Sequence, residues 1–380
     1  MNEQKICIIG DGLTGLSAAV ILGQENLKID LYLGKKKVIK KDDRTTAISE
    51  SSFQLIKQKI NIKNFNMFWP CKKINLFFED KKKVRQFLSL KENKKKLMYI
   101  FKNNELKKNL DRCVLAKKNI KLIKKNITSI DYEDGSILLN KNKFFYDLII
   151  LCTGHKSKLY DTISHGRSIE KDYKETALTT SIKHNLKTIN ASQYFLKEGP
   201  FAILPFKKNV FSVVWSVSND FLYNNNKSLK IILSKKIKVL LKNIKIKKIG
   251  KIKSYPINLN LKTKYFRKNI LILGDGLHVV HPMAGQGFNL VLRDIKKLSE
   301  LVSKTLKLGI SLGNSFTLND FYQSRKSENT ILGLGINLTN IFFKENKYFA
   351  PIKNRILKNI NNFDFINKIS KRISNKGISI

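Results

Sequence analysis

The sequence predicts an α/β protein that begins with a Rossmann-like dinucleotide-binding unit, and three observations carry this prediction. The apolar run at residues 5–9 is typical of a buried strand. Gly10, Gly12 and Gly15 follow it directly, before a helical stretch at residues 16–24 and a second strand at residues 29–33. Glycines at this spacing allow a tight turn and the approach of a pyrophosphate to the helix amino terminus. A purely structural glycine loop is the less favoured alternative.

A second glycine-rich segment, residues 274–289, says the most about function. An apolar strand at residues 269–273 runs into it, and Asp275 offers a hydrogen-bond acceptor directly after that strand. Gly285 and Gly287 carry no Cβ, so the backbone amides around them can converge on an anionic group at the start of the following helix. The segment is therefore suited to bring backbone against a large, flat ligand.

The order of residues in this segment resembles a known family. Residues 281–290 read HPMAGQGFNL and Arg293-Asp294 follow, which is similar to the signature of the aromatic-ring flavoprotein monooxygenases and, within them, of the ubiquinone-biosynthesis hydroxylases. The resemblance implies FAD as the cofactor. It further implies that the aspartate contacts the ribityl and pyrophosphate region, that the proline lies against the isoalloxazine face, and that the glycine-rich turn supports the pyrimidine edge. These roles fall to Asp275, Pro282, Gly285, Gln286, Gly287 and Asn289.

Two further segments resemble motifs of the same family. Residues 42–49, DDRTTAIS, are similar to D-x-R-x-x-A-L-S, whose arginine reaches cofactor phosphate or the mouth of the active site, and this implies such a role for Arg44. An arginine in a lysine-rich chain also indicates that the planar guanidinium group is needed there to bind phosphate in a bidentate manner. The alternative is that Arg44 is a solvated surface charge. Residues 104–117 have the apolar spacing of a helix with Asn103 as its N-cap, and residues 103–106 resemble the helix that returns to the cofactor.

Two acids expected at the cofactor are absent. The acid that would bind the adenosine ribose belongs about twenty residues beyond the glycines, where this chain has Leu33, and Asp30 falls in mid-strand. Residues 152–157 resemble A-D-G-x-x-S, which implies a cofactor role for Gly154, but Thr153 stands where the family has aspartate. Threonine forms a hydrogen bond without bringing charge. We therefore expect weaker adenosine binding, or contacts from other segments, and a larger share of cofactor binding for Asp275.

The remainder of the chain resembles the quinone-pathway branch of the family. Residues 173–178, 199–206 and 213–215 are similar to strands of its substrate half and are expected to form an apolar wall above the flavin. The resemblance implies the α/β fold of para-hydroxybenzoate hydroxylase, with a GR2-type, Rossmann-like FAD-binding domain interleaved with a substrate-binding β-sheet domain. We expect the FAD domain at residues 1–75, 100–160 and 265–310, the substrate domain at 76–99 and 165–264, and a carboxy-terminal helical region at 311–380.

The composition is strongly basic, with a formal charge of +44 that is spread along the whole chain. Lysines outnumber arginines by 64 to 9, and no basic segment has aromatic interleaving or helix-turn-helix spacing, so no nucleic-acid partner is expected. In the tail, residues 351–380, isoleucines recur three and four apart among lysines. This pattern favours packing on the body of the protein, with contact to anionic lipid as the alternative.

Cysteine usage and hydropathy indicate the compartment. The four cysteines, Cys7, Cys71, Cys113 and Cys152, have neither C-x-x-C pairing nor the spacing of a disulfide framework. No signal peptide precedes the first strand, and no apolar run reaches the roughly 18 residues that span a bilayer. We therefore expect a cytoplasmic protein, with peripheral contact to the inner membrane as the sharper hypothesis.

The predicted activity is FAD-dependent hydroxylation of the aromatic ring of a polyprenyl phenol or quinone precursor in ubiquinone biosynthesis. As the resemblance implies, NAD(P)H reduces FAD, O2 adds at the flavin C4a position, and the C4a-hydroperoxyflavin passes a hydroxyl group to the ring. No metal site and no catalytic base can be assigned, because His278 and His281 are equally compatible with structural roles.

Two other classes of function were weighed. Because two cofactor acids are missing, the alternative is a non-catalytic accessory or scaffold member of a ubiquinone-biosynthesis complex. A flavin-dependent halogenase would carry the motif W-x-W-x-I-P. The tryptophans of this chain are Trp69 and Trp215, so that class is set aside.

Overall fold

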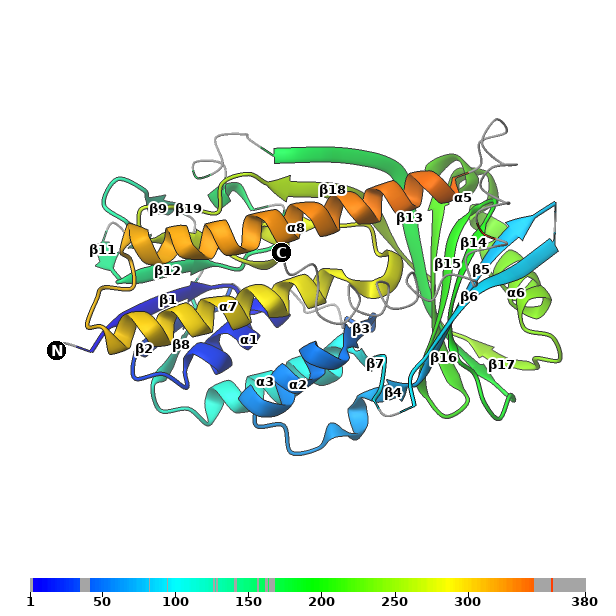
Figure 1. The fold of residues 1–380 in the computed structure, drawn as a ribbon, viewed down its shortest axis with the longest axis horizontal. Helices are drawn as coiled ribbons and strands as arrows, with labels where there is room; N and C mark the ends of the chain where they lie inside the picture. Colours follow the sequence, from blue (N-terminus) through cyan, green and yellow to red (C-terminus); the bar gives the residue numbers. More distant parts are fainter. Residues whose placement is uncertain are drawn as a thin grey trace.

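The computed structural model describes residues 3–34, 42–81, 83–93, 95–125, 129–139, 142–155, 157–160 and 168–344, together with residues 127, 163 and 357. The isoleucine face expected in the tail therefore lies outside the described residues. The molecule is elongated, with a sheet towards each end and two long helices running along its side (Figure 1).

A six-stranded sheet forms the half that contains the amino terminus, in the order β19-β20-β12-β1-β2-β8. Its strands pair in parallel except for β19, which runs antiparallel to β20. The apolar runs in β1, β12 and β20 are buried, as parallel strands of an α/β protein require. The strands predicted at residues 5–9, 29–33 and 269–273 are confirmed to within a residue or two. The bounds are β1 (Lys5–Ile9), β2 (Lys28–Tyr32), β8 (Ile120–Ile123), β12 (Leu148–Leu151), β19 (Phe266–Arg267) and β20 (Ile270–Ile272).

Three helices pack together beside this sheet: α1 (Leu13–Leu22), α3 (Asn103–Leu115) and α7 (Gly287–Lys307). Helix α1 begins directly at the glycine loop, with Gly12 as its N-cap residue. The predicted N-cap of α3 is wrong, because Asn103 is already its first residue and Lys102 precedes it without a capping hydrogen bond. The Asn103 side chain makes contacts with other segments instead.

Two small sheets complete this half. Strands β9 (Ser129–Asp131), β10 (Ser136–Leu139) and β11 (Asn142–Phe145) form an antiparallel meander, and β3 (Thr45–Ser49), β7 (Met98–Lys102) and β4 (Trp69–Cys71) form the second sheet. Helix α2 (Glu50–Lys59) follows β3, and the Ser49 hydroxyl caps it by accepting from the N–H of Ser52. Short 3-10 turns lie at Phe65–Met67, Lys158–Tyr160, Gly274–Gly276 and Met283–Gly285.

A nine-stranded sheet forms the opposite half, in the order β21-β18-β13-β16-β15-β14-β5-β6, with β17 paired to β13. The predicted boundary after residue 75 falls inside β5. Helices α5 (Asn219–Asn225) and α6 (Leu229–Leu240) contribute to a core on one face of the sheet, around Trp215. The bounds are β5 (Lys73–Asp80), β6 (Lys83–Lys91), β13 (Ser168–His184), β14 (Ala191–Leu196), β15 (Gly199–Lys207), β16 (Val210–Ser218), β17 (Ile246–Ile249), β18 (Lys253–Lys262) and β21 (His278–Val279).

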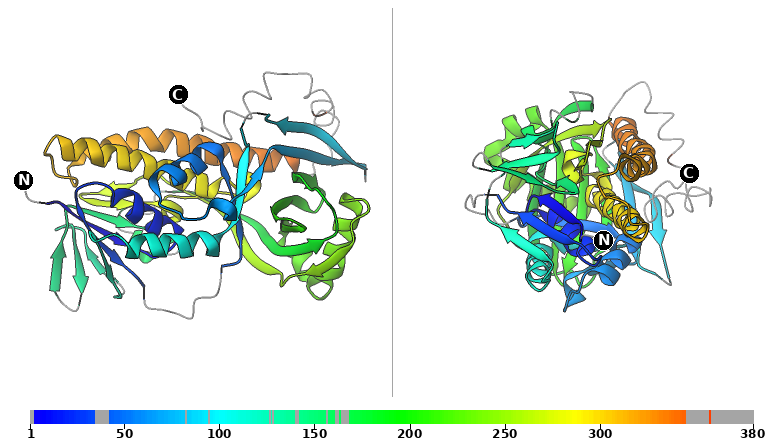
Figure 2. Two further views of the ribbon diagram at one scale, coloured as in Figure 1. Left: turned by 90° about the horizontal axis from the view of Figure 1, so that it is seen from below. Right: turned by 90° about the vertical axis from the view of Figure 1, so that its left-hand side faces the viewer.

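Two long elements connect the halves. Strand β13 pairs with β18 along most of its length and with β16 in its second part. Helix α8 (Ser315–Phe343) lies beside α7 and extends from the six-stranded sheet to the nine-stranded one (Figures 1 and 2). No helix within the described residues is long and apolar enough to cross a membrane.

Candidate cofactor site

The loop of Gly10, Gly12 and Gly15 turns tightly at the carboxyl end of β1. A Cβ on Gly15 would collide with the carbonyl oxygen of Gly10, and a Cβ on Gly10 would collide with that of Cys152. Gly12 differs, because a Cβ there would meet nothing within 4 Å. The loop is therefore closely packed underneath and open at the amino terminus of α1, where unpaired N–H groups and the helix dipole attract an anion.

The end of β12 lies beside this loop and carries Thr153 and Gly154. Both the backbone N–H and the hydroxyl of Thr153 contact the Tyr160 hydroxyl oxygen, at 3.0 and 2.9 Å. Tyr160 is 1% exposed, and burial raises its pKa well above the ordinary value. A Cβ on Gly154 would meet nothing within 4 Å. Tyr160 thus supports the threonine that replaces the family's aspartate, and the Gly154 backbone faces open space.

Asp275 lies at the carboxyl end of β20, between the two preceding segments. A Cβ on Gly274 would lie 2.6 Å from Thr14 of α1, and a Cβ on Gly276 would lie 2.6 Å from the Tyr160 ring. The residues on both sides of Asp275 are therefore packed against the glycine loop and the Tyr160 ring, while Asp275 itself is exposed. An exposed carboxylate held by a rigid turn is suited to bind hydroxyl groups of a ligand.

Arg44 enters the same region from the segment that precedes β3. Its Nε and Nη2 donate to the two carboxylate oxygens of Asp42, both at 2.8 Å, and its guanidinium lies over the Tyr255 ring at 4.9 Å. The hydrogen bond to Asp42 is the main cause that raises the pKa of Arg44, and the negative charge of Asp275 contributes. Arg44 is thus held in a fixed position within the field of Asp275, and this argues against a freely solvated surface charge.

The predicted turn from Pro282 to Asn289 packs against β3. Gly285 has a φ of +62°, and a Cβ there would lie 3.1 Å from that of Ala47, so both conformation and packing favour glycine. The Asn289 side chain accepts from the N–H of Ser49 at 2.9 Å and donates to the carbonyls of Ala47 and Gly285 at 3.2 and 3.1 Å. Both polar atoms of Asn289 are thereby used to hold the turn in place.

Helix α7 starts within this turn, at Gly287 with Gln286 as its N-cap residue. A Cβ on Gly287 would meet nothing within 4 Å. Pro282, at the other end of the turn, is exposed. The start of α7 is therefore not crowded at Gly287, and its first amides, which have no partner within the helix, could donate hydrogen bonds to a carbonyl of a flavin ring.

Sequence reasoning missed two side chains of α3 that reach this region. Asn103 donates to Asp42 at 3.0 Å and accepts from the Thr46 hydroxyl at 2.6 Å. The ammonium of Lys107 donates to the carbonyl oxygen of Asp11, inside the glycine loop, at 2.8 Å. Residues 103 and 107 are one helical turn apart and share a face. That spacing places the two residues on one face of a helix already expected to return to the cofactor, but it does not say which segment each side chain contacts.

The structure shows the surroundings of Leu33, which stands where an acid that binds the adenosine ribose was expected, and of Asp30. Leu33 packs partly buried against the core of the six-stranded sheet. Asp30 is buried in β2, where it accepts from the Tyr146 hydroxyl at 2.8 Å and lies 2.7 Å from the Lys5 ammonium. Asp30 is therefore committed to a structural contact and does not replace the missing ribose-binding acid.

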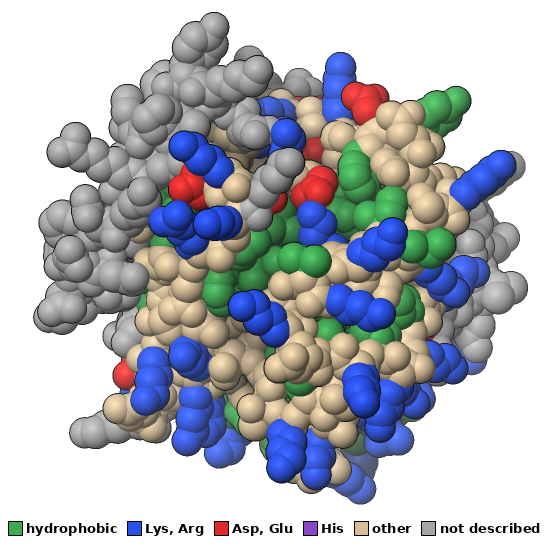
Figure 3. All heavy atoms as spheres, turned by 90° about the vertical axis from the view of Figure 1, so that its right-hand side faces the viewer, with side chains coloured by type: hydrophobic (Ala, Val, Ile, Leu, Met, Phe, Trp, Pro, Cys, Tyr) green, Lys and Arg blue, Asp and Glu red, His purple; other side chains and the backbone are tan. Residues whose placement is uncertain are grey.

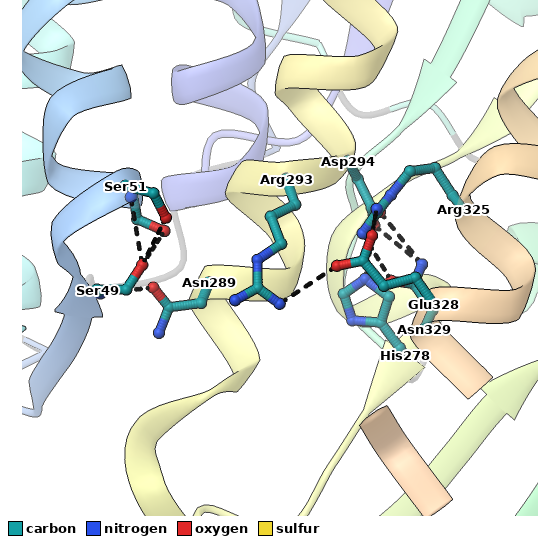
Figure 4. A network of polar contacts seen from close by, with 10 residues as sticks. Ser49, Ser51, His278, Asn289, Arg293, Asp294, Arg325, Glu328 and Asn329 are labelled. Atoms are coloured by element: carbon teal, nitrogen blue, oxygen red, sulfur yellow. Dashed lines mark hydrogen bonds and ion pairs between the residues drawn. The ribbon is translucent and has the colours of Figure 1, made fainter. Parts of the chain in front are cut away.

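His278 belongs to a buried network between α7 and α8, shown in Figure 4. Its Nε2 lies 2.6 Å from one Asp294 oxygen, and Arg325 donates from Nε to the other at 2.6 Å. Asn329 donates to the same carboxylate at 3.2 Å. Burial alone raises the pKa of Asp294, but the charge of Arg325 and the contact with His278 outweigh it, so the pKa is lowered. Asp294 of α7 is therefore joined to α8 through Arg325 and Asn329 and to β21 through His278.

His281 also has a structural partner. Its Nε2 lies 3.2 Å from Glu175, and its Nδ1 accepts from the N–H of Met283 at 3.2 Å. Neither histidine reaches an open surface, since they are 2% and 0% exposed. Within the described part of the chain, no group of three or more His, Cys, Asp or Glu residues could hold a metal ion.

The predicted glycines of the first loop, Gly154 and Asp275 lie at the carboxyl ends of β1, β12 and β20, whereas Arg44 and the turn from Pro282 to Asn289 lie next to β3. Open space at Gly12, Gly154 and Gly287 and the exposed carboxylate of Asp275 are compatible with FAD. The pyrophosphate would bind at the amino terminus of α1, the ribityl hydroxyls at Asp275, and the isoalloxazine ring beside Pro282 and the start of α7.

Solved structures share this architecture. The p-nitrophenol 4-monooxygenase PnpA from Pseudomonas putida DLL-E4 superposes with a TM-score of 0.77 at 14% identity, over 99% of this chain and 99% of that chain. Klebsiella pneumoniae HpxO, complexed with FAD and uric acid, gives a TM-score of 0.75 at 14% identity, over 98% of this chain and 97% of that one. At such identity the likeness shows the fold alone, and it confirms the predicted fold class.

Sequence comparisons find relatives that agree with this fold and with the predicted cofactor. A family model described as an FAD binding domain matches residues 141–308, which include β12 and the segment 274–289. The mitochondrial ubiquinone biosynthesis monooxygenase COQ6 of Dictyostelium discoideum is 25% identical over 465 aligned positions, which cover 100% of this chain and 92% of that protein. These matches support an FAD-dependent aromatic-ring monooxygenase of the ubiquinone-biosynthesis hydroxylase subfamily.

Other relatives of this monooxygenase align over shorter stretches. Ubiquinone hydroxylase UbiL of Rhodospirillum rubrum is 27% identical over 49% of this chain and 44% of its own length. The human COQ6 protein is 26% identical over 52% of this chain and 49% of its own length. The aligned region therefore spans about half of these two relatives. The monooxygenase is an oxidoreductase with FAD as its cofactor, so the predicted enzyme class and cofactor are confirmed.

Proposed function

We propose that this monooxygenase hydroxylates the aromatic ring of a polyprenylated phenol in ubiquinone biosynthesis, with O2 and NAD(P)H as co-substrates. The observation that carries the proposal is the alignment with the Dictyostelium protein, which is named a ubiquinone biosynthesis monooxygenase and is matched over 92% of its length. The fold alone does not choose a substrate, because solved structures with this fold are named for p-nitrophenol and for a complex with uric acid.

An apolar cluster beside the cofactor turn supports an isoprenoid substrate. Met283, the residue after Pro282, is buried in one cluster with Phe87, Phe195 and Phe206. Phe343, at the end of α8, stacks on Phe195 with ring centroids 3.5 Å apart. Aromatic and aliphatic side chains of this kind bind a hydrocarbon chain by removing its surface from water. The polyprenyl tail is therefore the part of the substrate whose burial against this cluster would contribute most to binding.

In this proposal, the residues of the chain bind the cofactor, orient the substrate ring and exclude water. When bound, FAD supplies the oxygen-transfer chemistry that no protein side chain provides. The amides at the starts of α1 and α7 would stabilise negative charge on the bound cofactor, and Asn289 holds the turn before α7 against β3. Met283 and the phenylalanine cluster keep water from the substrate ring.

The direct test is the set of quinone intermediates in a strain that lacks this protein. The proposal predicts that a prenylated precursor lacking one ring hydroxyl group accumulates, and that reintroducing the gene under oxygen-18 gas places a labelled oxygen at that ring position. Normal ubiquinone levels in the deletion strain, or an unlabelled hydroxyl, would contradict the proposal.

We further propose contact with the membrane in which such a substrate resides. Ile231 and Val239 of α6 are 60% and 70% exposed, and the sequence places Lys230, Lys235 and Lys238 among them. Figure 3 shows lysines around apolar side chains on the face of the molecule at this end. Exposed apolar groups among lysines favour an anionic lipid surface. We also propose that the protein works in the cytoplasm at the inner membrane, as part of a ubiquinone-biosynthesis complex.

A further inference from the structure

The histidine of the cofactor turn is held on three sides. His281 is completely buried, its Nε2 lies 3.2 Å from Oε2 of Glu175 on β13, and its Nδ1 accepts from the N–H of Met283 at 3.2 Å. The ring of Tyr173 meets it edge-on, with centroids 5.3 Å apart and planes at 88°. Because Nδ1 must carry a lone pair to accept this bond, the proton of the neutral ring sits on Nε2 and is donated to Glu175.

An irregularity of β13 lies next to this contact. The pairing of β13 with β18 shifts register between Asp172 and Glu175, and Lys174 has a φ of +52°. Tyr173 and Glu175 are 6% and 8% exposed, so both face the interior. Bulges are frequent beside functional sites, where they redirect a side chain and are retained despite a local loss of pairing.

Lys344, directly after α8, balances the charge of Glu175. Its ammonium lies 2.5 Å from Oε1, which leaves Oε2 for His281. Burial raises the pKa of Glu175, but the hydrogen bonds from His281 and Lys344 outweigh burial and lower it, so the group is a carboxylate. An ion pair with one exposed partner adds little stability, so the role of this pair is better sought in geometry.

We propose that Glu175 is a positioning residue for the cofactor turn. Its carboxylate keeps the His281 proton on Nε2, the bare Nδ1 holds the N–H of Met283, and Pro282 is fixed between these two residues. The inference rests on the proposed function, in which Pro282 lies against the isoalloxazine ring and the substrate is hydroxylated beside it.

A loosened turn should uncouple the reaction. In the coupled reaction, NAD(P)H, a proton, O2 and the ring yield NAD(P)+, water and the hydroxylated ring. In the uncoupled reaction, the hydride equivalent of NAD(P)H and the proton reduce O2 to hydrogen peroxide, NAD(P)+ is formed, and the ring is unchanged. The amount of hydroxylated product formed per NAD(P)H consumed therefore reports how well the turn is positioned.

The experiment compares Glu175→Leu with Glu175→Gln, whose amide oxygen can still accept from Nε2. Glu170→Gln is the matched control, because Glu170 lies on the same strand with an exposed carboxylate that bonds Ser168 and Asn260. Two readouts are taken on the FAD-loaded protein. Nitrogen-15 shifts of labelled histidine, assigned with His281→Gln, give the tautomer of His281, and 2-geranylphenol as the probe substrate gives the product formed per NAD(P)H.

We expect the wild type, Glu175→Gln and Glu170→Gln to keep the proton on Nε2 and most of the product yield. Glu175→Leu should show both tautomers and about a tenfold lower yield, the effect of losing one charged hydrogen bond. An unchanged tautomer and yield in Glu175→Leu would overturn the inference. A parallel fall in FAD content, NAD(P)H consumption and product without rescue by Glu175→Gln would also overturn it, because a purely structural role gives that result.

A second variant covers the case in which Glu175→Leu fails to fold. Lys344 is 52% exposed, so the Lys344→Met variant should fold. It should weaken the contact of Glu175 with His281 and lower the product formed per NAD(P)H, by less than Glu175→Leu does. An unchanged yield there would overturn the inference. If the wild type formed no product from the phenol, the proposed function would fail for this substrate class, and the tautomer of His281 alone would decide the positioning role.

Discussion

Asp275 is the residue whose removal should affect FAD binding most. Leu33 and Thr153 stand where relatives have acids, and Asp30 is engaged by Lys5 and Tyr146. The Asp275→Ala variant is therefore expected to purify with little FAD. A relative that keeps all three acids should retain more FAD after the equivalent substitution. The ratio of flavin to protein absorbance measures this, with Asp220→Ala on the exposed start of α5 as control. Full flavin content in Asp275→Ala would show that this residue carries little of the binding.

Lys107 should contribute a second, independent part of FAD affinity. Its ammonium lies 2.8 Å from the Asp11 carbonyl in the glycine loop, where the pyrophosphate is expected. Because hydrogen bonds to charged groups are worth about 1.5–3 kcal/mol, Lys107→Met should weaken FAD binding about tenfold or more. Fluorescence titration of the apoprotein measures the Kd. Lys108→Met, on the exposed side of α3, should leave it unchanged, and equal effects of both variants would refute a specific contact.

The glycines and Asp275 could be predicted from the sequence because their requirements are local: a strand end, a turn without Cβ and a helix start. Lys107 and Tyr160 could not. Lys107 contacts a carbonyl 96 positions away, and Tyr160 supports Thr153 from a segment without recognisable periodicity. Contacts of this kind depend on how α3 and β12 pack, which no local pattern encodes. The same holds for the pairing of Glu175 with His281, which are 106 positions apart.

At the scale of elements, the Asp294 network should determine how firmly α7 and α8 are joined. Asp294 is completely buried and receives bonds from Arg325 and Asn329. Asp294→Asn removes the buried carboxylate that Arg325 and His278 contact and leaves Glu328 as the acidic partner of Arg325, so a loss of about 1–3 kcal/mol in the free energy of unfolding is expected. Denaturant unfolding measures this. Asp320→Asn, a partly exposed acid of α8, should change it little, and a loss below about 1 kcal/mol for Asp294→Asn would contradict the assignment.

Asp294 and Glu175 predict how stability depends on pH. Burial raises the pKa of each carboxyl, but Arg325 and His278 at Asp294, and His281 and Lys344 at Glu175, outweigh burial and lower it. The stability they contribute is therefore present above the unfolded-state values of about 3.9 and 4.3 and is lost as pH falls through the folded values. The free energy of unfolding should decrease from about pH 5 downward. In Asp294→Asn this slope should be shallower, and an identical slope measured by urea unfolding would exclude the network as its source.

Prediction from sequence succeeded for elements with long apolar runs and failed where the pattern is mixed. Strands β1, β12 and β20 are buried, so nearly every position is apolar. Strand β6 pairs with β5 at the edge of its sheet and exposes Arg85 and Gln86, so it lacks such a run. The start of α3 was misplaced because Asn103 has the composition of a cap but is used to bond Asp42 and Thr46.

At the scale of the whole molecule, the excess of lysines predicts salt-sensitive binding to anionic vesicles. The double variant Ile231→Glu, Val239→Glu should reduce sedimentation with such vesicles, because it removes apolar contact and adds negative charge on the exposed face of α6. Binding should also weaken as ionic strength rises. Leu115→Glu is the control, because Leu115 is 72% exposed on α3. Equal binding by the double variant and the control would exclude this face, and removal of residues 351–380 tests the tail separately.

The most direct test of the account is the absorption spectrum of the purified protein during one redox cycle. We predict a yellow protein whose flavin band is bleached by NAD(P)H without air and returns when air is admitted. With a prenylated phenol present, the return of the band should be accompanied by a hydroxylated product. A colourless protein that takes up no added FAD, or a flavin that NAD(P)H does not reduce, would contradict the account.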